Sequence, residues 1–169
     1  RQLADFDQFK ESGEDKIVLA GIDRIGGETT VNVREWDAAT RTLGLLQTRR
    51  TTDSRATSSL VLEALRAAFR PLVQIDQTKD GAVTLRGKSN LIPPHDPAWN
   101  PLREGMVFEP YYRYLNKERK VERITRVPWT YLVSGPPVPD EGRAPGIPIS
   151  GLRTAISARR RRIEAVALG

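Results

Sequence analysis

Aromatic and arginine side chains lie close together in the second half of the chain, in a pattern that could bind nucleic acid. Tyr112 and Arg113 belong to the run Tyr111-Tyr112-Arg113-Tyr114, and Arg123 and Arg126 follow after a short turn. Aromatic rings stack on bases and guanidinium groups pair with phosphates, so both kinds on one sheet face would bind a single strand. Strand alternation, however, places Tyr112 and Arg113 on opposite faces. The pattern therefore favours core aromatics with an ion-paired outer face, and nucleic-acid binding is the alternative.

A second cluster of positive charge is a run of four consecutive arginines near the C-terminal end. Its members are Arg159, Arg160, Arg161 and Arg162. Such a run can contact phosphates, but guanidinium groups also pair with carboxylates of a neighbouring subunit or domain. The net charge of +6 arises entirely from residues 99–169, with 13 basic and 7 acidic side chains, because residues 1–98 carry 14 of each. The basic second half is therefore a candidate surface for a protein partner, or alternatively for nucleic acid.

The residue inventory leaves little for catalysis. The absence of Cys excludes disulfides, thiolate metal sites and cysteine nucleophiles, since each needs sulfur. The single His95 adjoins Asp96, whose side chain does not easily converge with it on one ligand, and no Gly-x-Ser-x-Gly motif is present. We therefore expect no enzyme activity, metal, cofactor or small-molecule substrate. A site around His95 and Asp96 is the enzymatic alternative.

Length and hydropathy describe an ordinary globular chain. It has 169 residues, of which 38% are hydrophobic and 28% charged, and it contains no run of about 18 apolar residues that would predict a transmembrane helix. The first residues lack the apolar stretch of a signal peptide, and the chain begins with Arg1, so we expect a processed part of a larger protein. The absence of Cys is compatible with the cytoplasm and with a compartment outside it, which leaves the localisation open.

The spacing of apolar residues predicts a first module of order βββαββ over residues 1–89. An apolar run at 17–22, a Gly-Gly turn and strict alternation over 29–36 indicate a hairpin, and 42–48 supplies a third strand. The period then changes to 3.6, which predicts a helix that Pro71 ends; its apolar positions are Leu60, Val61, Leu65, Ala68, Phe69 and Leu72. Two short strands follow at 73–76 and 82–86.

The rest of the chain predicts a mostly β, basic second module. Residues 90–100 contain three Pro and are expected to form a linker or loop, and residues 105–115 and 120–133 predict a long hairpin. With five Pro and three Gly, 135–148 predicts an extended or mobile excursion. Residues 151–169 fit a helix or short strands nearly equally, and strands, which would close a barrel, are slightly favoured. The fold class is therefore α+β, with a barrel-like or sandwich-like module at 101–169.

These observations indicate a non-enzymatic role. We expect a structural or protein-interaction module, a component of a larger assembly, whose Pro-rich segments at 90–100 and 135–148 offer exposed backbone to a partner. The alternative is a nucleic-acid-binding protein that uses the basic C-terminal module.

Overall fold

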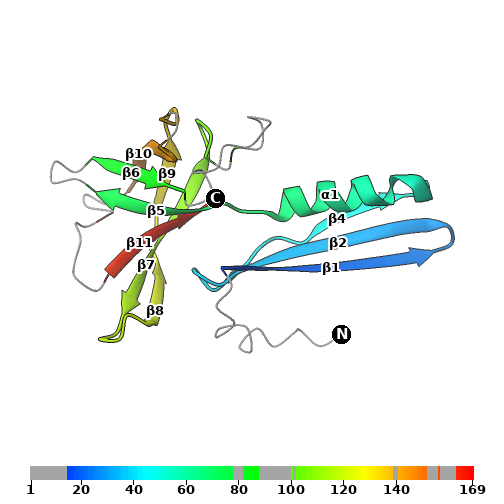
Figure 1. Cartoon of the computed structure of the whole chain (residues 1–169), viewed down its shortest axis with the longest axis horizontal. Helices are drawn as coiled ribbons and strands as arrows, with labels where there is room; N and C mark the ends of the chain where they lie inside the picture. Colours follow the sequence, from blue (N-terminus) through cyan, green and yellow to red (C-terminus); the bar gives the residue numbers. More distant parts are fainter. Residues whose placement is uncertain are drawn as a thin grey trace. The chain divides into compact units, whose positions relative to one another are not determined.

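The computed structural model describes residues 15–77, 82–87, 100, 102–138, 141–151, 156 and 163–169 of the chain. The chain divides into two compact units, Arg1–Arg70 and Pro71–Gly169 (Figure 1). The first unit combines antiparallel strands with an α-helix, and the described part of the second is built from strands. The predicted α+β fold class, a mixed module followed by a barrel-like one, is confirmed.

The first unit is built around β2, the central strand of its sheet. β2 pairs with β1 on one side and with β3 and β4 on the other, always antiparallel; the bounds are β1 (Lys16–Ile25), β2 (Glu28–Asp37), β3 (Thr42–Leu43) and β4 (Gln47–Thr51). Gly26 and Gly27 join β1 to β2 with φ of +59° and +86°. Two positive φ values are what a type I′ turn requires, and Gly adopts them without steric cost. The predicted hairpin is therefore confirmed.

The helix α1 (Thr57–Ala68) packs on β2 and β4, after a single 3₁₀ turn, η2 (Ser54–Ala56). Its apolar side chains recur at helical spacing and meet Val31 and Val33 of β2; they are Leu60, Val61, Ala64, Leu65 and Ala68. This contact is the core of the first unit. The helix ends at Ala68, where Phe69 turns to an extended conformation two residues before Pro71. Proline has no backbone N–H donor with which to continue the helix.

The second unit contains a closed barrel. Its strands are β5 (Leu72–Gln77), β6 (Val83–Arg86), β7 (Val107–Leu115), β8 (Val121–Arg126), β9 (Thr130–Ser134), β10 (Arg143–Ser150) and β11 (Ile163–Leu168). The pairing runs from β11 through β5, β6, β10, β9 and β7 and returns to β11, whereas β8 pairs with β7 outside this ring. Buried apolar side chains form the core, among them Val73, Leu85, Leu102, Phe108, Leu132 and Ala167.

Two strands belong to a different unit from the one predicted. β5 and β6 follow α1 in the expected order, but β5 pairs with β11 and β6 with β10, so both are part of the barrel. The predicted first module of residues 1–89 is therefore corrected to residues 1–70. Periodicity identifies a strand but not its partner, because these pairings join segments far apart in the sequence. The predicted linker at 90–100 lies outside the described residues, apart from Asn100.

The predicted Pro-rich excursion at 135–148 is also corrected, because its second half is β10. The carbonyl of Pro145 accepts from the amide of Gly135 at 2.8 Å, so this carbonyl points to the side of β9. The nitrogen of the same residue points to the same side, and the pairing of β10 with β9 begins only one residue later, at Gly146. The backbone of Pro148 faces the side of β6. It lies beyond the last residue pair between β10 and β6, which is Gly146 with Val83. Neither proline therefore occupies a position where the sheet needs an N–H donor.

The C-terminal segment is a strand where it is described. β11 pairs with β5 on one side and with β7 on the other, and it thereby closes the barrel. The strand alternative for residues 151–169 is confirmed for Ile163–Leu168. Pairing on both sides explains the outcome, since a strand in this position completes two ladders whereas a helix would leave two open edges.

Candidate interaction surface

The predicted site residues on β7 and β8 occupy two different faces of this strand pair. Residues directly opposite each other in an antiparallel pair share a face. Tyr112 lies opposite Thr125 and Tyr114 opposite Arg123, while Arg113 lies opposite Ile124 and Tyr111 opposite Arg126. Tyr112 and Arg123 are therefore on one face, and Arg113 and Arg126 are on the other. The structure does not bring the four predicted residues together on one surface.

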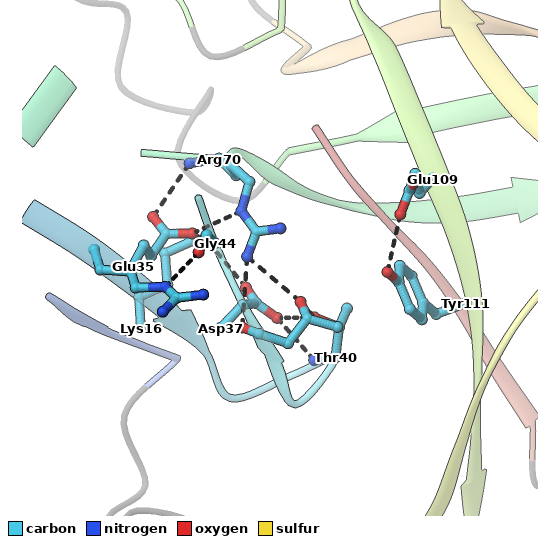
Figure 2. Close-up of polar contacts among 10 residues, drawn as sticks. Lys16, Glu35, Asp37, Thr40, Gly44, Arg70, Glu109 and Tyr111 are labelled. Atoms are coloured by element: carbon cyan, nitrogen blue, oxygen red, sulfur yellow. Dashed lines mark hydrogen bonds and ion pairs between the residues drawn. The ribbon is translucent and has the colours of Figure 1, made fainter. Parts of the chain in front are cut away.

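Arg126 is engaged by a neighbouring acid. Its Nη2 lies 2.7 Å from Glu109 Oε1. The hydroxyl of Tyr111 donates to Glu109 Oε2 at 3.1 Å (Figure 2). Glu109 thus accepts from both residues, and the ring of Tyr111 is buried beside Val166 and Leu168. This arrangement is the ion-paired outer face with packed aromatics that the sequence favours.

Arg123 stacks on an aromatic ring. Its guanidinium carbon lies 4.8 Å from the centre of the Tyr114 ring, and its Nε donates to Thr125 Oγ1 at 3.1 Å. A guanidinium over a tyrosine face is a favourable cation–π contact. The four arginines of the basic run, Arg159 to Arg162, lie outside the described residues, as do His95 and Asp96.

The first unit contains a buried polar network that sequence analysis missed. Lys16 Nζ lies 2.9 Å from Glu35 Oε1 and 2.9 Å from Asp37 Oδ2, and both carboxylates are fully buried (Figure 2). The backbone amide of Arg70 donates to Glu35 Oε2 at 3.1 Å, and Thr40 donates to Asp37 Oδ1 through its amide at 2.7 Å and its hydroxyl at 2.6 Å. Every carboxylate oxygen of the pair therefore has a partner.

This network joins elements rather than offering a reactive group. Lys16 is on β1, both carboxylates are on β2, Thr40 is in the following turn, and Arg70 follows the helix. These hydrogen bonds hold the parts in one arrangement, and the full burial of both carboxylates keeps them away from a substrate in solution. Among the described residues, no three or more acidic or histidine side chains are placed to hold a metal ion.

The outer side of the barrel carries exposed apolar side chains on adjacent strands. In the β9–β10 pair, Ile149 lies opposite Tyr131 and Ile147 opposite Val133, and Val107 of β7 lies opposite Val133 from the other side. The exposed fractions are 56% for each isoleucine, 54% for Val107 and 41% for Tyr131. Residues that are paired in this way are neighbours, so the apolar surface is continuous across three strands.

Trp129 extends this surface at the turn before β9. It is 80% exposed, and its carbonyl accepts from the amide of Gly151, which follows Ile149 and Ser150 in β10. Its φ is +52°, directly after Pro128. Proline followed by a positive φ fits a type II turn, in which Gly or Asn is the usual second central residue. A bulky side chain in this conformation costs stability, on the order of 1 kcal/mol. We call Val107, Trp129, Tyr131, Ile147 and Ile149 the barrel patch.

The barrel patch was not predicted from the sequence. Two signals were present: a tryptophan in a Pro-Trp turn, and isoleucines at alternate positions 147 and 149. Neither could be interpreted alone, because an alternating apolar strand normally faces a core. Here the inward positions of β10 are taken by Ala144 and Gly146, and the larger isoleucines face outward.

Comparison with known proteins adds no assignment. No family model matches the chain, and no curated protein or solved structure matches it either. In the part of the chain that the structure describes, no helix has the length and apolar character needed to cross a membrane.

Proposed function

We propose that this chain is a non-enzymatic structural or protein-interaction module, a component of a larger assembly, which binds a protein partner through the barrel patch. The observation that carries the proposal is Trp129, which is both 80% exposed and held at a positive φ. Neither property contributes to folding. A strained, exposed aromatic residue is better explained by contact with another molecule, because functional sites are where such strain persists.

The composition of the barrel patch supports a protein as the partner. Trp and Tyr are enriched at the centres of protein interfaces, and the cores of interfaces are poor in charged residues. Beyond Val107 on the outer side of β7 lies Glu109, paired with Arg126, so a charged group borders the apolar residues. An apolar centre beside a polar border is the usual organisation of a protein-binding surface.

The nucleic-acid alternative has weaker support in the described residues. Arg126 is already paired with Glu109, and Arg113 and Arg123 point to opposite sides of the β7–β8 pair. A strand of nucleic acid bound to one face of this pair would therefore meet only part of the predicted residues on β7 and β8. The remaining basis for this alternative is the local positive charge of residues 99–169 and the stacked pair of Arg123 and Tyr114.

The proposal is tested by capturing partners from the native source with cross-linking and mass spectrometry. Trp129→Asn keeps a residue that tolerates positive φ but removes the aromatic ring. Leu45→Asn is the matched control, since Leu45 is also 80% exposed and lies outside the barrel patch. We expect Trp129→Asn to lose the partner that the unaltered chain and Leu45→Asn both capture. Equal capture by all three proteins would contradict the proposal.

A further inference from the structure

The outer edge of β1 is long and apolar. Within the described residues, β1 pairs with β2 only, so the other side of this ten-residue strand is an open sheet edge. Six consecutive residues, 17–22, have no charged or proline side chain. An open edge of this kind is a template for pairing with another strand.

The backbone groups that point outward can be assigned from one hydrogen bond. The amide of Ala38 donates to the carbonyl of Asp15 at 3.0 Å, which places the backbone of Asp15 on the side of β2. Backbone direction alternates along a strand, so the odd-numbered residues of β1 also face β2. The even-numbered residues present their N–H and C=O groups to the open side; they are Lys16, Val18, Ala20, Ile22 and Arg24.

The side chains of the same residues are incompletely covered. Val18, Ala20 and Ile22 lie opposite Glu35, Val33 and Val31, respectively, on the face of the sheet where α1 packs. The main helix contacts are with β2 and β4, and Val18 and Ile22 remain 45% and 56% exposed.

The flank of the helix toward β1 is apolar as well. The ring of Phe69 lies 5.4 Å from Lys16 Nζ, which places it on the β1 side, and Leu62 is two turns earlier on the same side. Phe69 and Leu62 are 48% and 47% exposed. The open backbone edge of β1 and these exposed apolar side chains therefore lie on the same side of the first unit.

The strand at the opposite side of the sheet has a different character. β4 has five residues and carries Arg49 and Arg50. Short length and charged side chains are the usual protection of an edge against pairing. β1 lacks this protection over residues 17–22, which distinguishes it as the edge that is suited to a partner.

We propose that β1 pairs with β1 of a second copy of this chain, in the antiparallel direction, around a two-fold axis at Ala20. The reason for choosing a second copy is self-complementarity. In this register Val18 lies opposite Ile22 of the second copy and Ala20 opposite Ala20, so every outward position from 18 to 22 gains an apolar neighbour. The N–H and C=O groups that point to the open side in one copy also meet such groups of the other copy, since both residues of each pair are even-numbered.

The charges at the ends of the pairing permit this arrangement. Arg24 of one copy lies opposite Lys16 of the other, which would be repulsive if Lys16 were a free cation. Lys16, however, lies 2.9 Å from each of two buried carboxylates, and Glu35 is also paired with Arg70. Arg24 therefore approaches a group of four charges that sums to zero, and the dimer continues the sheet of one copy into the other.

The test measures the mass of the full chain in solution over a concentration series, by light scattering or sedimentation, with hydrogen exchange in parallel. We expect a concentration-dependent dimer. The amides of Val18, Ala20 and Ile22 should become protected as the dimer forms, while the odd-numbered amides of β1 are protected throughout by β2. A monomer at all concentrations overturns the proposal, whether the even-numbered amides are open or already protected. A dimer in which these amides exchange freely overturns it as well.

Two variants locate the contact. Ile22→Lys is expected to give a monomer, whereas Ile25→Lys, which changes an 81% exposed isoleucine on the opposite face of the strand, should remain a dimer. Ala20→Pro removes only an outward N–H, so it should also give a monomer with an unchanged circular dichroism spectrum, because proline is tolerated on the open side of an edge strand. If Ile22→Lys and Ala20→Pro both dimerise as well as the unaltered chain, the interface is elsewhere and the proposal is wrong.

Discussion

Lys16 and Glu35 form an ion pair of 2.9 Å although they are not opposite each other in the β1–β2 ladder. Lys16 lies opposite Asp37, and Glu35 is its diagonal neighbour on the same face, so a single ammonium group reaches both carboxylates. Both acids are fully buried, whereas Lys16 retains 18% of its side-chain exposure. The stability of the first unit therefore depends on one lysine at the beginning of its edge strand.

Lys16→Met should destabilise the first unit strongly. The substitution leaves two buried carboxylates without their shared cation, and breaking a buried ion pair costs about 3 to 5 kcal/mol in free energy of unfolding. Urea unfolding measures the loss. Lys120→Met is the control, because Lys120 is 80% exposed and lies 3.9 Å from an exposed Glu118, a pair that contributes less than about 1 kcal/mol. Similar small losses in both variants would show that the buried network does not hold the unit together.

Trp129→Gly should leave the second unit as stable as before, or more stable by up to about 1 kcal/mol. Glycine removes the cost of a positive φ, and the exposed ring has little to lose. Gly105→Ala is the converse control: φ is +79° and a Cβ would meet no atom within 4 Å, so the loss of about 1 kcal/mol would come from backbone conformation alone. Thermal unfolding compares the two. A marked loss in Trp129→Gly would mean that the ring packs on the fold.

Gly146→Ala should destabilise the barrel by about 1 to 3 kcal/mol, the usual cost of overpacking a core. A Cβ at this position would lie 2.9 Å from Val83 Cγ1 and 3.1 Å from Leu85 Cγ, and both neighbours are buried in the barrel. Gly21→Ala provides the comparison, since nothing lies within 4 Å of its Cβ position and the change should be within about 0.5 kcal/mol. Denaturant unfolding of both variants checks the difference. An unaffected Gly146→Ala would mean that Val83 and Leu85 move aside at no cost.

Nucleic acid should not bind the full chain tightly. We expect no saturable change in fluorescence anisotropy with random single-stranded or duplex oligonucleotides, because Arg113 and Arg123 lie on opposite faces of the β7–β8 pair and Arg126 is already paired with Glu109. The experiment is a salt series. Three to five phosphate contacts would instead give a slope of roughly −3 to −4.5 in the logarithm of the affinity against the logarithm of salt concentration. If that slope is found, Arg123→Ala should reduce it by about one contact.

Local patterns in the sequence predicted the elements better than their partners. The Gly26-Gly27 hairpin and the helix ended by Pro71 follow from conformational limits on a few neighbouring residues, so they could be predicted. β10 could not, because the two prolines that argue against a strand occupy positions whose amides the sheet does not use. Which amides are used depends on where along β10 the pairing with β6 stops and the pairing with β9 starts, and no local pattern contains that information.

The candidate surfaces show the same division. Alternation in the sequence correctly separated Tyr112 from Arg113, and Arg126 is ion-paired as expected. The sequence by itself determined the composition, the local positive charge, the strands and the helix, because these depend on residue type and short-range geometry. Only the tertiary structure decided that β5 and β6 belong to the barrel, that Trp129 adjoins an outward row of isoleucines, and that Lys16 serves two buried acids. The physical reason is that burial and pairing are relations between distant segments, and they exist only once the chain has folded.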